Sequence, residues 1–151
     1  QRIPVFGRLF EHTQGTDIVG PRDKRFAKRQ WWCKFVPSVE EWRIHCMKFP
    51  SGTYRSIARG KKVQVEEPWR KLLVRNRGNG WRLDHTTDPP EAVREAAKAA
   101  VAACGYDFGA VDLLVLADNS VVVLEVNKAP GLDDYTASKY AEALRKVAAK
   151  Q

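Results

Sequence analysis

The stretch Glu125-Val126-Asn127-Lys128-Ala129-Pro130-Gly131 directly follows an apolar run, residues 120–124, that is typical of a buried strand. Residues two positions apart on a strand point to the same side, so Glu125 and Asn127 should share one face. Asp112 lies thirteen residues before Glu125, at the start of a second apolar run. The segment between the two runs, residues 117–120, has the composition of a turn. A hairpin would therefore bring Asp112, Glu125 and Asn127 together at one of its ends.

Carboxylate and amide oxygens of this kind are the hard ligands that Mg²⁺ prefers, and a Mg²⁺ ion held by few protein groups keeps positions for phosphate oxygens. The hairpin is therefore a candidate metal site in a protein that handles a nucleoside triphosphate. The ordinary alternative for Glu125 and Asn127 is a charged strand end followed by a turn-forming asparagine. That alternative leaves Asp112 unexplained.

The composition of the chain is that of a globular protein. Its 151 residues, 44% of them hydrophobic and 10% aromatic, are enough for one domain with a real core. No apolar run approaches the roughly 18–20 residues of a membrane span, and the N-terminus has no secretory signal, so no membrane partner is expected. Three scattered cysteines without a CxxC pair favour a reducing compartment, and we expect a cytoplasmic protein.

Charge is distributed unevenly along the sequence. Residues 1–82 contain 19 Lys and Arg against 7 Asp and Glu, whereas residues 83–151 contain 7 against 11. A basic half facing an acidic half would suit a site for nucleotide phosphates and a metal ion. A basic half could equally contact nucleic acid, and solvated surface lysines and arginines remain the plain alternative.

Hydrophobic patterning predicts an α+β fold with an antiparallel sheet. We expect strands at 3–10, 30–36, 41–48 and 53–59, and a hairpin over 112–126. A helix is expected over 91–104 with Asp88 as its N-cap, and a final amphipathic helix should start at Thr136 or Ser138. Residues 63–71 are ambiguous between strand and loop, and residues 76–80 are predicted to form a turn.

Three blocks of this sequence resemble, in order, the ATP-grasp superfamily of carboxylate–amine ligases, closest to its RimK-type and glutathione-synthetase-like branch. Residues 8–18 resemble the strand and loop that cover the phosphates. Residues 34–36, followed by 41–44, are similar to the hinge strand that frames adenine and the strand after it. Residues 109–112 and 125–131 resemble the metal block of the family, including the thirteen-residue gap. Residues 75–81 also resemble a segment of viral and uncharacterised ATP-grasp proteins.

The resemblance implies the ATP-grasp fold, in which two α+β lobes with antiparallel sheets clasp ATP. Residues 1–36 would be the remaining part of the small nucleotide-binding lobe, and residues 37–151 the large lobe with the metal hairpin. The N-terminal part of the fold would be missing. The implied activity depends on ATP and Mg²⁺: a carboxylate is activated as an acyl phosphate and then attacked by an amine, and neither substrate is identified.

The resemblance also implies roles for individual residues. Arg43 and Arg75 would act on the transferred phosphoryl group or the acceptor, and Asp112, Glu125 and Asn127 would hold Mg²⁺. The nucleotide would be bound by Arg8, Gly15, Lys34, Phe35, Val36, Lys61 and Asn76, with Lys62 as the alternative to Lys61.

The sequence departs from the family pattern at two positions. Ala110 stands where D-alanine ligase relatives carry an arginine, and Asp17 stands where close relatives often carry a second glycine of the phosphate loop. A second hypothesis therefore stays open, namely a non-catalytic ATP-grasp-derived module within a larger assembly. Such a module could contact nucleic acid through the basic stretches 21–29 and 61–82.

Overall fold

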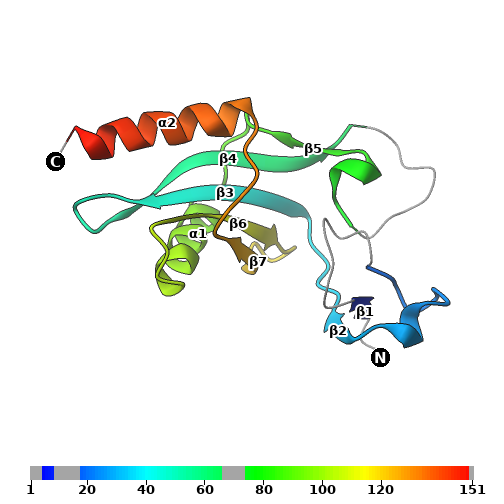
Figure 1. Cartoon of the computed structure of the whole chain (residues 1–151). Helices are drawn as coiled ribbons and strands as arrows, with labels where there is room; N and C mark the ends of the chain where they lie inside the picture. Colours follow the sequence, from blue (N-terminus) through cyan, green and yellow to red (C-terminus); the bar gives the residue numbers. More distant parts are fainter. Residues whose placement is uncertain (1–4, 9–17, 66–73, 150–151) are drawn as a thin grey trace. The chain divides into compact units, whose positions relative to one another are not determined.

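The computed structural model describes residues 5–8, 18–65 and 74–149. Within these residues the chain has the predicted α+β architecture (Figure 1). No helix in the described residues is long and apolar enough to cross a membrane. The elements in chain order are β1 (Val5–Arg8), a 3₁₀ turn (Phe26–Lys28), β2 (Trp31–Lys34), β3 (Glu40–Lys48), β4 (Tyr54–Gln64), a second 3₁₀ turn (Arg77–Asn79), β5 (Trp81–Asp84), α1 (Glu91–Ala103), β6 (Phe108–Val115), β7 (Val121–Asn127) and α2 (Asp134–Ala148).

The chain packs as two compact units. The first comprises residues 1–37 and 64–82, and the second comprises residues 38–63 and 83–151. The first contains the antiparallel pair β1–β2, in which Val5 faces Lys34 and Arg8 faces Trp31. The assignment of residues 1–36 and 37–151 to the small and large lobes of an ATP-grasp enzyme stays a prediction.

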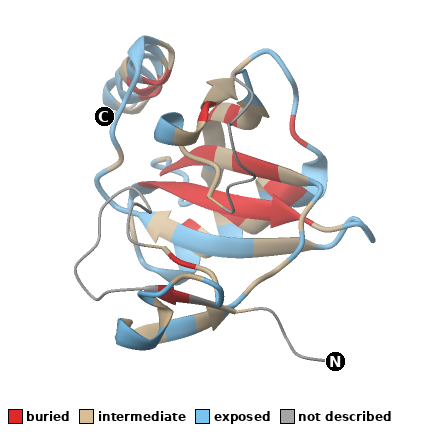
Figure 2. Ribbon diagram, turned by 90° about the vertical axis from the view of Figure 1, so that its right-hand side faces the viewer, coloured by how far each residue is buried: buried red, intermediate tan, exposed pale blue. Residues whose placement is uncertain are grey.

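Strands β3 to β7 form one five-stranded sheet in the order β5-β4-β3-β6-β7. β3 pairs antiparallel with β4 and β6, and β6 pairs antiparallel with β7. Buried residues are concentrated in β3 and β6, because a central strand is covered on both faces (Figure 2). The predicted hairpin of β6 and β7 is confirmed, with Asn119 of its turn at a positive φ of 64°.

The helix α1 covers one face of this sheet. Its buried residues Val93, Ala97 and Val101 recur every four positions and therefore lie along one side of the helix. They pack against Trp42 and Val111 in the main core. The prediction that Asp88 caps this helix is wrong: the N-cap is Pro90, and the Asp88 carboxylate instead lies 3.2 Å from the Arg59 guanidinium.

The helix α2 packs against residues of the other face, where Tyr140 and Ala143 contact Met47. It begins at Asp134, two residues before the first predicted start at Thr136, because Asp133 is its N-cap. The Asp133 carboxylate accepts a hydrogen bond from the Thr136 backbone N–H, and the Thr136 hydroxyl accepts one from the Asp133 N–H. This reciprocal capping satisfies two groups that the first turn leaves free.

Several strands differ from the sequence-based expectation. β2 ends at Lys34 and not at Val36, and β6 begins at Phe108, before the hairpin expected over residues 112–126. β4 extends to Gln64 and takes up part of the ambiguous segment 63–71, and the short strand β5 was not predicted. The sequence of β5, Trp-Arg-Leu-Asp, is too short for its alternation to stand out from the flanking turns.

Candidate functional site

The register of β6 and β7 brings the three predicted metal ligands together. Asp112 lies directly opposite Glu125, and Asn127 lies opposite Ala110, two residues before Asp112 on β6. Residues that face one another across an antiparallel pair point to the same side of the sheet. Asp112, Glu125 and Asn127 therefore share one face, the face opposite to α1.

A β-bulge produces this alignment. Asp112 pairs with Glu125 and Leu113 pairs with Val123, so Leu124 is an extra residue without a partner opposite it. Simple alternation from Val123, which faces the same side as Leu113 of the core, would turn Glu125 and Asn127 towards α1. The extra residue restores them to the face of Asp112, which is how bulges commonly re-aim a side chain near a functional site.

The neighbouring strand β3 adds Arg43 to this row of side chains. Arg43 lies opposite Asp112 and donates two hydrogen bonds to it, from Nε to Oδ1 and from the terminal nitrogen to Oδ2, both 2.7 Å long. The Arg43 side chain is 28% exposed and the Asp112 side chain is 9% exposed, so water screens this ion pair only in part. The hydrogen bonds that Arg43 donates to Asp112 hold the pKa of the Arg43 guanidinium above its ordinary value.

The oxygen atoms of this row fit a Mg²⁺ ion in number and chemistry. Each Asp112 oxygen accepts one bond from Arg43 and keeps a further lone pair. Asn127 Oδ1 accepts a 2.9 Å hydrogen bond from the Ala129 N–H, which orients the amide and also leaves a lone pair. The Glu125 side chain is exposed, and its carboxylate makes no hydrogen bond or ion pair with the other described residues. The described residues contain no cluster of three His, Cys, Asp or Glu side chains that could hold a metal alone, so a cation here would need the Asn127 amide and outside oxygens such as phosphates.

The two candidate lysines of β4 lie on opposite faces of the sheet. Lys61 lies opposite Trp42 on β3, so its side chain is on the face of α1. On that face Lys61 Nζ donates a hydrogen bond to Glu40 and lies 5.5 Å from the centroid of the Trp42 ring. Lys62 instead bonds to Glu41, which shares the face of Arg43 because it lies two residues away on β3. Within the second unit, the structure therefore brings Lys62, and not Lys61, to the face of the candidate metal ligands. Glu41 was not predicted as a site residue, although its spacing from Arg43 was a usable signal.

The remaining predicted residues belong to the first unit or lie outside the described residues. Lys34 is exposed at the end of β2, and Phe35 and Val36 are half-buried just after it. Arg75 lies over the Trp81 ring at 5.1 Å, and Asn76 caps the second 3₁₀ turn by accepting a hydrogen bond from the Asn79 N–H. The backbone of Arg8 is part of β1, its side chain is not described, and Gly15 lies outside the described residues.

A buried polar pair lies beside the row on the same face. His45, two residues after Arg43, is 1% exposed, and its Nδ1 lies 3.2 Å from the Tyr140 hydroxyl. Burial, assisted by the positive charge of Arg43, lowers the pKa of His45 from 6.5 to about 4. Burial also raises the pKa of Tyr140 to about 12. Both groups are therefore neutral near pH 7 and anchor α2 to β3, a role that the sequence did not reveal.

Solved structures of ATP-grasp ligases share this fold. The chain superposes on an ADP complex of PurK, the N5-carboxyaminoimidazole ribonucleotide synthetase, with a TM-score of 0.62 and 16% identity, over 97% of this chain and 41% of that one. The ATP-grasp ligase PsnB, complexed with its minimal precursor, matches with a TM-score of 0.66 and 13% identity, over 96% of this chain and 48% of the PsnB chain. The D-alanine–D-alanine ligase from Coxiella burnetii matches with a TM-score of 0.60 and 13% identity, over 95% of this chain and 40% of the ligase chain.

The chain thus has the fold of part of an ATP-grasp ligase, and it spans less than half the length of these three enzymes. At identities this low, the likeness concerns the fold. No protein-family model matches the sequence, and no curated protein is significantly similar to it.

Proposed function

We propose that this chain is an ATP- and Mg²⁺-dependent carboxylate–amine ligase of the ATP-grasp type, or the nucleotide-binding part of one. The observation that carries the proposal is the row of Arg43, Asp112 and Glu125 across three adjacent strands, with Asn127 turned to the same face by the bulge at Leu124. The row places a cation and three oxygen-bearing side chains on the face opposite to α1, and oxygen ligands of this kind beside a positive charge suit Mg²⁺ and phosphate groups.

Each residue of the row has a chemical task in this proposal. Bound Mg²⁺–ATP would supply a phosphoryl group whose charge is partly neutralised, so that a substrate carboxylate can accept it. Glu125 and Asn127 would hold the metal directly, and Asp112 would offer its remaining lone pairs. Arg43 fixes Asp112 and would supply a positive charge to the phosphates, where charge develops during transfer. Lys62 would add a second cation on the same face.

Two of the similar structures were solved with ligands that fit this proposal. PurK was solved as an ADP complex, and PsnB was also solved with its precursor, Mg and ADP. Those ligands belong to those proteins, and they guide the choice of probe here. The carboxylate and amine substrates of this chain are left open by the proposal.

Isothermal titration with ADP or a non-hydrolysable ATP analogue, with and without Mg²⁺, tests the proposal. We expect binding that depends on Mg²⁺ and falls at least about tenfold in Glu125→Gln and in Asn127→Ala, which is the loss expected for one charge-assisted contact of ~1.4 kcal/mol or more. Glu91→Gln is the matched control, because Glu91 is an exposed carboxylate on α1, away from this face. Absence of nucleotide binding by the wild type, or equal binding by all three variants, would refute the proposal.

The second candidate is a non-catalytic module that contacts nucleic acid. The observation that favours it is the set of exposed cations in the first unit, namely Arg22, Lys24 and Lys28. Retention on immobilised RNA or DNA that falls steeply with salt, and that is lost in an Arg22→Glu/Lys24→Glu variant, would support this candidate. Retention that is unaffected by this charge reversal would count against it.

A further inference from the structure

The outer edge of β4 is covered along only part of its length. At one end, a Cβ atom added to Gly60 would lie 3.0 Å from the Leu83 Cβ of β5, and the Arg59 carbonyl accepts a hydrogen bond from Nδ1 of His85. From Tyr54 to Ala58, β4 pairs with β3 alone among the described residues. Within the described part of the chain, this half of the strand therefore has N–H and C=O groups without a backbone partner, and such groups are a template for another strand.

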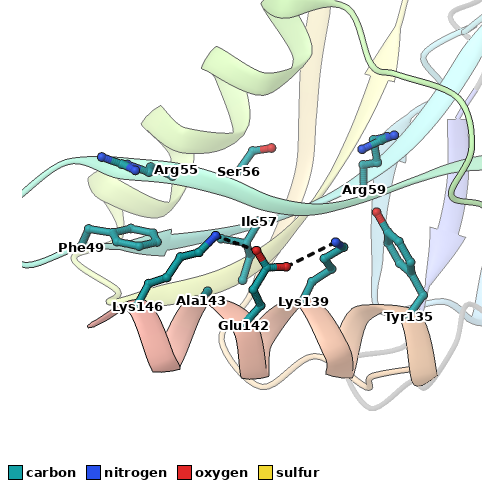
Figure 3. A pocket seen from close by; sticks show the side chains of 10 residues that line it. All are labelled: Phe49, Arg55, Ser56, Ile57, Arg59, Tyr135, Lys139, Glu142, Ala143 and Lys146. Carbon is teal, nitrogen blue, oxygen red and sulfur yellow. Dashed lines mark hydrogen bonds and ion pairs between the residues drawn. The ribbon is translucent and has the colours of Figure 1, made fainter. Parts of the chain in front are cut away.

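A cavity of about 270 Å³ runs between this edge and α2. Figure 3 shows Lys139, Glu142 and Lys146 rising from α2 towards the strand, with Ile57 of β4 pointing down between them. Arg55 and Arg59 line the cavity from β4. We call this cavity the β4–α2 groove; all of its lining belongs to the second unit.

The β4–α2 groove has an excess of positive charge. Glu142 is the one carboxylate of its lining, and it pairs with Lys146 at 2.6 Å and with Lys139 at 3.4 Å. Arg59 pairs with a carboxylate outside the lining, that of Asp88. Four cations, the fourth being Arg55, thus face two carboxylates, so the groove favours an anionic occupant.

We propose that the β4–α2 groove binds an extended acidic peptide, which adds as a strand to the edge of β4 between Tyr54 and Ala58. Five residues of strand span about 17 Å, and main-chain hydrogen bonds to such an edge supply affinity while side chains supply selectivity. Side chains of an added strand alternate between the two faces, so carboxylates at every second position would face Lys139 and Lys146. This binding needs neither nucleotide nor metal, and it therefore stands or falls separately from the proposed ligase function.

Cationic side chains on a strand edge can also serve only to prevent pairing between copies of a protein. The test must therefore separate peptide binding through the main chain from attraction by charge alone. The probe is a fluorescein-labelled peptide, Glu-Val-Glu-Val-Glu-Val-Glu, and the readout is its fluorescence anisotropy with the full chain at low salt. A second peptide carries the same charges but is N-methylated at every backbone nitrogen, so that it cannot donate main-chain hydrogen bonds to the strand edge in either orientation.

We expect the unmodified peptide to bind, and the N-methylated peptide to bind at least about tenfold more weakly. Lys139→Glu/Lys146→Glu should weaken binding of the unmodified peptide by a similar factor, whereas Lys98→Glu on α1 should not change it. If the double variant does not fold, as judged by circular dichroism, Arg55→Glu replaces it. No binding, equal binding of the two peptides, equal binding by the charge-reversed variant, or complete displacement by pyrophosphate would each overturn the proposal.

Discussion

Lowering the pH from 7 to 4 should destabilise the fold through one buried side chain, His45. Burial, and next the positive charge of Arg43, lower the pKa of His45 from 6.5 to about 4. Between these two values the unfolded chain binds a proton at His45 and the folded chain does not, so the free energy of unfolding decreases as the pH falls. The free energy of unfolding therefore keeps its full value, as far as His45 is concerned, above pH 6.5. It decreases steadily as the pH falls from 6.5 towards 4.

The magnitude follows from the two pKa values of His45. At about 1.4 kcal/mol per pH unit, the difference between 6.5 and about 4 corresponds to about 3 kcal/mol. This is a large fraction of the roughly 5–15 kcal/mol that separates folded from unfolded states of a typical domain. The contact with Tyr140 does not cause the effect, because burial is its main cause.

Urea denaturation at several pH values between 4 and 7 measures the effect. Other carboxylates titrate in the same range, so the quantity of interest is the difference between wild type and His45→Gln, which cannot take up this proton. That difference should change by about 3 kcal/mol across the range, in the direction that favours the variant at low pH. Tyr140→Phe is the control: it loses the 3.2 Å contact but should keep the pH dependence of the wild type. If His45→Gln shows the same pH dependence as wild type, the assignment to His45 is refuted.

Three further predictions concern the site and its frame. A double-mutant cycle with Arg43→Gln and Asp112→Asn should give a coupling of about 2 kcal/mol in urea denaturation, because the pair is bidentate and half-buried; a coupling near zero would contradict its importance. Asp133→Ala should destabilise the chain by about 1 kcal/mol through loss of the α2 cap, whereas Asp133→Asn should recover most of this loss. In Mg²⁺-dependent nucleotide titrations, Lys62→Ala should weaken binding about tenfold and Lys61→Ala much less, because only Lys62 shares the face of Asp112; the opposite order would contradict the assigned faces.

Most of the elements of this fold could be predicted from local patterns. The alternation around Trp42 predicted β3, the turn with Asn119 predicted the β6–β7 hairpin, and the helix expected over residues 91–104 is α1. The ends of the helices were less predictable. Asp88 and Asp133 both suit an N-cap by residue type, yet only Asp133 caps a helix. The helix α1 begins at Glu91 with Pro90 as its N-cap, and the Asp88 carboxylate lies beside the Arg59 guanidinium of β4.

The sequence by itself determined which residues can form the site: the spacing of Asp112, Glu125 and Asn127, together with two apolar runs, was enough to predict a hairpin with oxygen ligands at one end. Only the tertiary structure decided which face of the sheet they occupy. The bulge at Leu124 shifts the register by one residue, and a one-residue shift moves every later side chain of the strand to the opposite face. Lys61 and Lys62 likewise lie on opposite faces of the sheet. Which of them shares the face of Asp112 depends on the pairing of β4 with β3, and the two strands pair residues that are far apart in the sequence.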